Sequence, residues 1–228
     1  MKILDRSALR NVQTVDYSDS NVDASHKVLR NTYMLLSMTL LFSALTAAAS
    51  IAFALPSPGI IITLVGYFGL LFLTNKFRNS GLGILFVFAL TGFMGLTIGP
   101  IISHYLGMAG GAGIVMSAMG LTGAIFLSLS AYVLVSKRDF SFMGGFLMIG
   151  MLVAFVASLG AIFFQIPALS LTISAAMVLL MSGMILFETS NIIRGGETNY
   201  IMATVSLYVT ILNLFLSLLQ LLGFIDKE

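Results

Sequence analysis

The sequence predicts an all-α integral membrane protein that forms a bundle of seven transmembrane helices. The 228-residue chain is 58% hydrophobic and only 9% charged, with a mean hydropathy of +1.04, whereas an ordinary soluble domain is about 25% charged. Its apolar residues fall into seven runs of nearly membrane-spanning length or more, separated by short breaks. This composition argues against a soluble enzyme, a nucleic-acid-binding protein or a disordered chain.

The N-terminal residues 1–31 are polar and carry charges of both signs. They favour a flexible cytoplasmic tail with transient structure, although a few apolar positions also fit a weak amphipathic helix. The tail contains no apolar run of the kind found in secretory signals. We therefore expect the first membrane helix to direct insertion.

The breaks between the apolar runs carry residues that end helices, such as Pro56 and Pro58 after the first run and Gly195 and Gly196 after the sixth. The expected spans are residues 32–54, 59–74, 82–103, 114–135, 142–164, 169–193 and 200–224. They form one domain at 32–224 and leave 225–228 as a short external C-terminus. Because the second span is the shortest, six spans and one re-entrant segment are the alternative.

The lysines and arginines predict the orientation of the bundle. With seven spans, ten of these eleven residues fall on the side of the N-terminus, and only Lys227 falls on the other side. Cytoplasmic loops carry an excess of Lys and Arg. We therefore expect a cytoplasmic N-terminus and a C-terminus on the opposite side.

Glu188 is the carboxylate that comes nearest to the membrane interior. It lies about six residues, or roughly 9 Å, inside the expected cytoplasmic end of the sixth helix. One interpretation is an interfacial carboxylate that faces headgroup water or pairs with Arg30 or Arg194. The other is a buried, protonatable group that acts as a pH-responsive switch, since charged residues within spans are functional candidates.

The seventh span carries a polar stripe with spacings of four, three, four and three residues, which places its members on one helix face. They are Ser206, Thr210, Asn213, Ser217 and Gln220. A polar face toward lipid is unfavourable, so we expect a central seventh helix whose stripe faces the bundle interior. The sixth and seventh spans form an antiparallel hairpin, which puts Glu188 at the depth of Ser206 and Thr210. The stripe serves either helix packing or a pH-sensing site or ion pathway of Glu188, Thr210, Asn213 and Ser206.

Patterns for catalysis, cofactors and metals are missing from the sequence. It contains no cysteine, and its two histidines, His26 and His104, lie outside the interiors of the spans. It has no phosphate-binding loop, no zinc-protease motif and no serine-hydrolase motif. We therefore expect a protein that is not an enzyme and that has no cofactor and no metal site.

Four stretches occur in an order that resembles a known family. They are HKVLRNTY at 26–33, TGF and LTIGPI within 91–101, ILFETSNII at 185–193 and SLYVTILNLF at 206–215. Together they resemble the Bax inhibitor-1 (TMBIM) family, and residues 187–200 are similar to its bacterial YccA-like branch. The resemblance implies a seven-helix bundle whose last helix is enclosed by the others.

The family resemblance also implies an alternative function, a pH-sensitive calcium or cation leak channel. In calcium-leak members, two membrane aspartates on the sixth and seventh helices form a pH-sensitive pair. The matching positions here are Glu188 and Thr210. Because Thr210 is not acidic, the two residues cannot share a proton as a carboxylate pair, which argues against the calcium leak.

The YccA-like branch implies an interaction protein of the bacterial inner membrane that binds and modulates FtsH, a membrane-anchored AAA protease, and is slowly degraded by it. About 30 extended residues reach roughly 100 Å, and proteolysis normally starts at exposed ends. Met1, Lys2, Ile3 and Leu4 are therefore the expected protease handle. The implied partners are FtsH and the lipid bilayer, with calcium or protons for the alternative function and a periplasmic C-terminus.

Overall fold

The computed structural model describes residues 6–225, and the side chains of residues 24–224 apart from residue 162. In this range seven helices are long and apolar enough to cross a membrane, which confirms the predicted fold class. They are α1 (Arg6–Ala52), α2 (Gly59–Lys76), α3 (Gly81–Leu106), α4 (Gly111–Ser136), α5 (Gly144–Phe164), α6 (Pro167–Ile193) and α7 (Tyr200–Ile225), with a short 3-10 helix η1 (Ser141–Met143) before α5. With 18 residues, α2 is about 27 Å long and is a complete helix, not a re-entrant segment.

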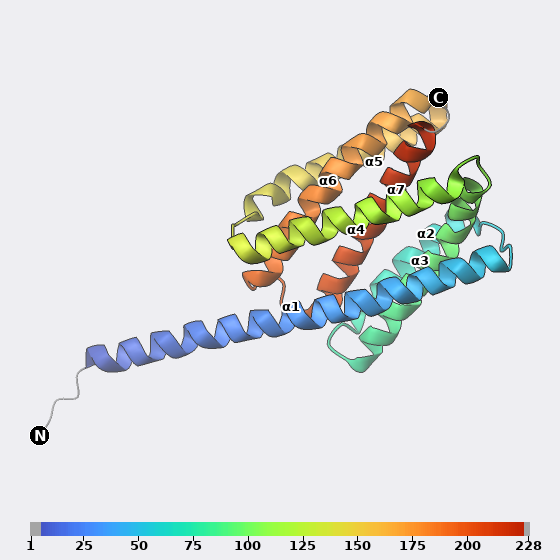
Figure 1. The fold of residues 1–228 in the computed structure, drawn as a ribbon. Coiled ribbons are helices and arrows are strands. Elements are labelled where there is room, and N and C mark those ends of the chain that lie inside the picture. The colour runs from blue at the N-terminus through green and yellow to red at the C-terminus, as the bar shows by residue number, and fades with distance from the viewer. Residues whose placement is uncertain (1–5, 226–228) are drawn as a thin grey trace, which may run out of the picture.

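The first helix differs most from the expected boundaries. The other spans begin and end within about three residues of their predicted limits, but α1 begins at Arg6, and Ala24–Ala52 is its stretch that is long and apolar enough to cross a membrane. Figure 1 shows α1 continuing past the bundle as one helix, where the sequence favoured a tail with transient structure. The mobility of this segment stays a prediction, and Met1, Lys2, Ile3 and Leu4 lie outside the described residues.

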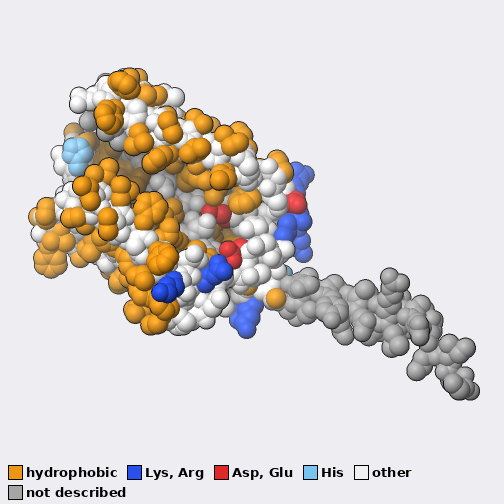
Figure 2. Space-filling view, turned by 180° about the vertical axis from the view of Figure 1, so that it is seen from behind, with side chains coloured by type: hydrophobic (Ala, Val, Ile, Leu, Met, Phe, Trp, Pro, Cys, Tyr) orange, Lys and Arg blue, Asp and Glu red, His pale blue; other side chains and the backbone are white. Residues whose placement is uncertain are grey.

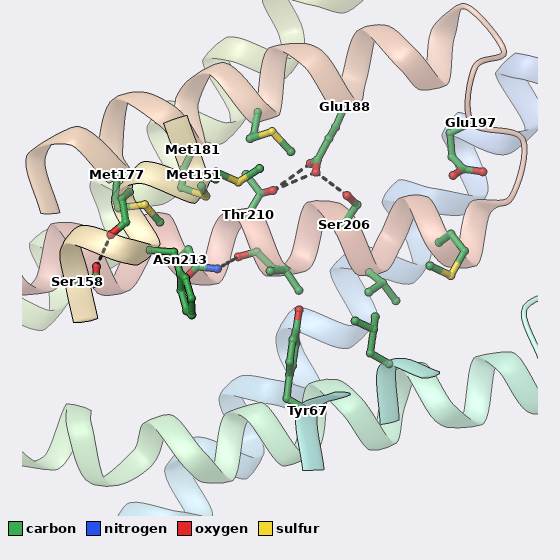
Figure 3. Close-up of a pocket in the computed structure, with 17 residues that line it drawn as sticks. Tyr67, Met151, Ser158, Met177, Met181, Glu188, Glu197, Ser206, Thr210 and Asn213 are labelled. Atoms are coloured by element: carbon green, nitrogen blue, oxygen red, sulfur yellow. Dashed lines mark hydrogen bonds between the residues drawn. The ribbon is translucent and has the colours of Figure 1, made fainter. Parts of the chain in front are cut away.

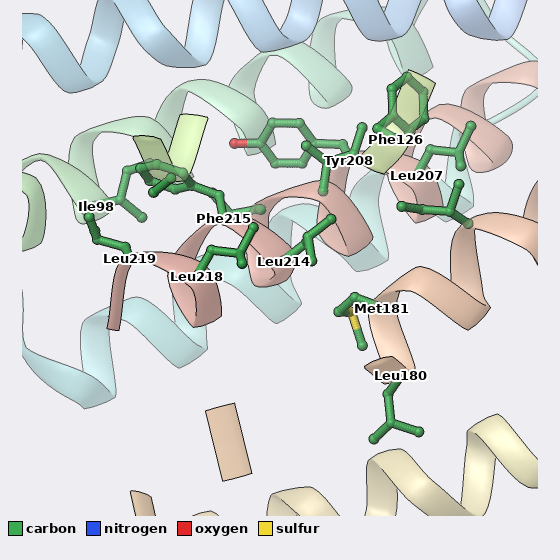
Figure 4. Packing of buried hydrophobic residues seen from close by; sticks show 14 of the residues in the cluster. Ile98, Phe126, Leu180, Met181, Leu207, Tyr208, Leu214, Phe215, Leu218 and Leu219 are labelled. Carbon is green, nitrogen blue, oxygen red and sulfur yellow. The ribbon is translucent and has the colours of Figure 1, made fainter. Parts of the chain in front are cut away.

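The last helix is the centre of the bundle, as predicted. α7 packs against α1, α2, α3, α4 and α6, and 61% of its most apolar stretch is buried, compared with 6% for α2 and 11% for the span that contains α5. Its side chains Leu207, Tyr208, Leu214 and Leu219 are completely buried, and Figure 4 shows them within the apolar cluster around α7. Burial from several sides explains why α7 tolerates a polar stripe.

Two outer helices lie on different parts of the bundle. α2 packs on α3, and α5 packs on α6, but α2 and α5 do not contact each other. Figure 1 shows α5 and α6 on one side of α7 and α2 and α3 on the other. Figure 2 shows a hollow between two apolar lobes, with acidic side chains visible inside it. The large apolar side chains on the outer faces are exposed because they meet lipid in the membrane.

Candidate functional site

The side chain of Glu188 lies between α6 and α7 and accepts hydrogen bonds from two hydroxyls of α7. Ser206 Oγ donates to Glu188 Oε1 at 2.6 Å, and Thr210 Oγ1 lies 3.1 Å from Oε1 and 3.2 Å from Oε2. Figure 3 shows the carboxyl group pointing from α6 toward these two residues. The structure thus brings together three of the four residues expected at the site.

The turn between α6 and α7 sets this alignment. Gly195 adopts a left-handed conformation with φ = +74°, which ends α6 at little steric cost. Asn199 then caps α7, because its Oδ1 accepts hydrogen bonds from the backbone N–H groups of Ile201 and Met202 at 3.1 Å. A short turn with fixed ends holds the two helices antiparallel and in one register, so Glu188 faces Ser206 and Thr210.

Neither arginine expected as an ion-pair partner reaches Glu188. Arg194 Nε lies 3.6 Å from Asp139 Oδ1, which is the only ion pair among the described residues. Arg30 is exposed and lines a separate pocket with His26 and Lys137. Arg194 meets Asp139 because both lie in connections at the same end of the bundle, whereas Glu188 points sideways toward α7. With an exposed fraction of 6%, Glu188 is buried within the bundle, and this burial favours the interpretation of a buried group over that of an interfacial carboxylate.

Asp139 has its own hydrogen bonds in the connection from α4 to η1. Its Oδ1 accepts from the backbone N–H of Ser141 at 2.9 Å and from Ser141 Oγ at 2.6 Å. These two bonds, and to a smaller extent the charge of Arg194, lower the pKa of the Asp139 carboxyl group below its ordinary value. Asp139 is therefore a carboxylate at neutral pH and organises the connection between α4 and η1.

A pocket of about 670 Å³ opens beside Glu188. It is lined by α2, α5, α6 and α7, and Figure 3 shows Tyr67 of α2 on the side opposite Glu188. The fourth predicted site residue, Asn213, also lines the pocket, and its Nδ2 donates to the backbone oxygen of Val209 at 2.8 Å. The pocket therefore contains all four predicted residues, Ser206, Thr210, Asn213 and Glu188.

Sequence reasoning missed most of the apolar lining. Met177, Met181 and Met184 of α6 line the pocket, and their spacings of four and three residues place them on one helix face. That pattern is visible in the sequence. Tyr67 and Glu197 had no such signal, because one comes from a distant helix and the other from the turn before α7.

The chemistry available at this site is that of one carboxyl group with hydroxyl donors. Among the described residues, no group of three or more His, Cys, Asp or Glu side chains could hold a metal ion. Ser206 and Thr210 both donate to the carboxyl group of Glu188. The arrangement can bind a proton or a cation, and its open side faces the outer helices α2 and α5.

Comparisons with known proteins place the chain in a family. The family model described as Inhibitor of apoptosis-promoting Bax1 matches residues 25–227. Modulator of FtsH protease YccA of Escherichia coli (strain K12) is 56% identical over 205 residues, which cover 90% of this chain and 93% of the relative. A relative from another Escherichia coli strain, O6:H1, with the same identity and coverage, is named Inner membrane protein YccA.

A third relative, an uncharacterized protein of Pseudomonas aeruginosa, is 54% identical over 196 residues, which cover 86% of this chain and 88% of the relative. None of these three names describes an enzyme. Seven apolar helices and the inner-membrane relative together identify a multi-pass inner membrane protein. By the family match and by these identities over nearly its whole length, the chain belongs to the Bax inhibitor-1 family.

Proposed function

We propose that this protein is an interaction protein of the bacterial inner membrane that binds FtsH, modulates its proteolysis and is itself slowly degraded by it. The observation that carries the proposal is the 56% identity, over 90% of the chain, to a relative named Modulator of FtsH protease. The protein acts by contact rather than by catalysis. Its N-terminus lies in the cytoplasm and its C-terminus in the periplasm, in keeping with the distribution of Lys and Arg.

The shape of α1 supports this role. The helix continues from its membrane-spanning part back to Arg6, beyond the rest of the bundle. Figure 2 shows most of the visible Lys and Arg side chains gathered toward one end of the molecule. A cytoplasmic extension of this length presents the chain end to a protease outside the bilayer. We propose that FtsH engages the chain at Met1, Lys2, Ile3 and Leu4.

Deleting residues 1–20 tests the proposal directly. The shortened protein is expected to have a longer half-life than the full chain in cells that contain FtsH, measured after synthesis is stopped. The full chain is also expected to copurify with FtsH from native membranes.

A deletion of residues 226–228 is the matched control, because it removes the other end of the chain and is expected to leave the half-life unchanged. Equal half-lives of the full chain and the 1–20 deletion, together with no copurified FtsH, would contradict the proposal. Copurification with an unchanged half-life would retain the binding and reject the tail as the handle.

The second candidate function is a pH-sensitive calcium or cation leak. The observation that favours it is the pocket beside the buried Glu188, where Thr210 donates a hydrogen bond to the carboxyl group. The family resemblance gives Thr210 the position of the second aspartate in calcium-leak members. A hydroxyl at this position holds the carboxylate but cannot share a proton with it as a second acid does, so the leak ranks behind the interaction role.

Flux into liposomes decides the second candidate. Reconstituted protein is expected to pass calcium in a pH-dependent manner, and Glu188→Gln is expected to flatten that dependence, because the amide does not titrate. Asp139→Asn is the control, since Asp139 lies in an exposed connection away from the pocket. A flux equal to that of empty liposomes would reject the leak.

A further inference from the structure

The pocket beside Glu188 has the size and position of a small-molecule site. Its volume of about 670 Å³ lies within the range of about 300–1,000 Å³ that is usual for ligand pockets. It lies between helices that do not contact each other, α2 on one side and α5 on the other. Phe155 of α5 lines it and is 61% exposed, so the pocket opens sideways toward the lipid.

The walls of the pocket suit an apolar ligand with aromatic groups. Five methionines contribute to the lining, and methionine side chains adapt to ligands of different shape because they are unbranched and polarizable. They are Met151, Met177, Met181, Met184 and Met202. Tyr67 and Phe155 add aromatic rings, whose faces attract cations.

The charges of the pocket have one sign. Among its 17 lining residues the charged ones are Glu188 and Glu197, and none is Lys, Arg or His. Glu188 has no cationic partner among the described residues, because the one ion pair there joins Arg194 and Asp139. Buried charges in proteins are normally paired. A buried carboxyl group that faces a pocket without a cation therefore leaves a position for a positively charged ligand.

The donor set favours an organic cation over a metal ion. Calcium takes six to eight oxygen ligands, often from several carboxylates, whereas the described residues offer no cluster of three or more acidic or histidine side chains. Two hydroxyls already occupy part of the Glu188 carboxyl group. A cation whose charge is spread over an apolar body needs one nearby carboxylate and apolar contacts, which this pocket supplies.

We propose that the pocket between α2, α5, α6 and α7 binds lipophilic organic cations that enter from the bilayer. The apolar body of the ligand contacts the methionines and aromatic rings, and its charge lies against Glu188. This binding activity is independent of the proposed contact with FtsH, which is carried by the similarity of the chain and by its N-terminal segment. It is also distinct from a leak, because a bound cation need not cross the membrane.

Tetraphenylphosphonium and tetraphenylborate provide a sharp test, because they have nearly the same size and shape but opposite charge. Radiolabelled tetraphenylphosphonium is expected to bind the purified full-length protein saturably in equilibrium dialysis, at about one site per chain. Tetraphenylborate is expected to show only the linear uptake of the detergent micelles. Glu188→Gln is expected to weaken tetraphenylphosphonium binding about tenfold or more, because it removes the charge without changing the shape.

Asp139→Asn removes a carboxylate outside the pocket and is the charge control, with unchanged binding expected. A second pair of variants uses Ser158, which lines the pocket and bonds only to its own helix, at the Ala154 backbone oxygen. Ser158→Phe is expected to fill the pocket and abolish saturable binding, whereas Ser158→Ala is expected to bind normally.

Three results would each overturn the proposal. They are the absence of saturable tetraphenylphosphonium binding, equal saturable binding of tetraphenylborate, and undiminished binding by both Glu188→Gln and Ser158→Phe. If Glu188→Gln does not fold, the Ser158 pair decides, since neither of those variants removes a contact between helices. Copurification of FtsH is measured on the same variants and is expected to be unchanged, which separates this proposal from the proposed function.

Discussion

The interface between α1 and α3 is closely packed, whereas the pocket beside Glu188 is open, although small and hydroxyl-bearing residues lie in both regions. At the interface, Gly95 and Gly99 let the two helices approach so closely that an added Cβ would overlap atoms of α1. Such spacing of small residues permits close packing of helices in membranes. At the pocket, α2 and α5 do not contact each other, and open space remains beside the buried carboxyl group of Glu188.

Hydroxyl groups differ between the two regions in the partners they serve. Between α1 and α3, Ser50 Oγ donates to the backbone oxygen of Leu96 at 3.0 Å, and next to this interface Ser43 Oγ of α1 and Tyr208 Oη of α7 lie 2.7 Å apart. In the pocket, Ser206 and Thr210 donate hydrogen bonds to the carboxyl group of Glu188. Polar groups in the closely packed region therefore join one helix to another, whereas those in the pocket fix the position of the Glu188 side chain.

Gly95→Leu is expected to have the largest effect, because it attacks the closed interface. The new side chain would overlap Thr46 Oγ1 and the backbone oxygen of Ser43, and backbone atoms cannot move aside cheaply. Overpacking usually costs about 1–3 kcal/mol and occasionally more, and we expect about 3 kcal/mol or loss of the folded protein. Thermal unfolding in detergent measures it. Gly120→Leu is the control, because a Cβ there meets open space, and equal loss in both variants would contradict close packing as the cause.

Thr210→Val tests how much the Thr210 hydroxyl contributes to holding the Glu188 carboxyl group in the pocket. It removes the hydroxyl that lies 3.1 and 3.2 Å from the two oxygens of Glu188. We expect a loss of about 1–3 kcal/mol, the usual cost when a buried polar group loses its partner. The loss should shrink when Glu188→Leu is also present, since the unsatisfied group is then gone. Equal losses in both backgrounds, measured by thermal unfolding, would show that Thr210 acts by packing alone.

Tyr208→Phe tests the hydrogen bonds that join helices in and beside the closely packed region. The change removes the hydroxyl that bonds to Ser43 Oγ and donates to the backbone oxygen of Thr91 at 3.3 Å, and it keeps the ring. The expected loss is about 1 kcal/mol, as for a typical hydrogen bond between membrane helices. Tyr132→Phe is the control, because Tyr132 is 45% exposed. A loss in the control as large as that at Tyr208 would contradict the assignment.

Asp139→Asn is expected to have the smallest effect, because the ion pair with Arg194 is exposed, with fractions of 43% and 54% for the arginine and aspartate side chains. The pKa of Asp139 is lowered in the folded protein. Its contribution is therefore present above its ordinary pKa of about 4 and is lost as the pH falls through the lowered value. The protection of the Ser141 amide, which is its exchange rate relative to the intrinsic rate at the same pH, should fall over that interval in the natural protein and stay constant in the variant. The unfolding temperature is expected to remain unchanged.

Much of the fold follows from local features of the sequence. The seven apolar runs fixed the number of spans and, for six helices, their ends to within about three residues. The polar stripe predicted a central α7, because polar residues on one face require cover from lipid. The start of the first helix was harder to predict. Its polar residues up to 23 continue the membrane helix, and the sequence has no helix-starting signal at Arg6.

The candidate site divides in the same way. Short-range reasoning placed Glu188 opposite Ser206 and Thr210, because two helices joined by a six-residue turn have a fixed relative depth. It did not find that Arg194 pairs with Asp139, or that Tyr67 and Phe155 line the pocket. Arg194 and Asp139 lie in connections 55 residues apart in the sequence, and Tyr67 lies on a helix far from α6 and α7 in the sequence.

The sequence by itself predicted seven membrane-spanning helices, the family that the chain resembles, and Glu188 as the carboxyl group nearest to the interior of the expected spans. These properties depend on hydropathy, helical periodicity and residue order, which are local. Only the tertiary structure decided that α2 and α5 stay apart, that Glu188 is without a cationic partner among the described residues, and that a pocket opens beside it. Those properties depend on how close distant helices come, which is set by side-chain packing across the whole bundle.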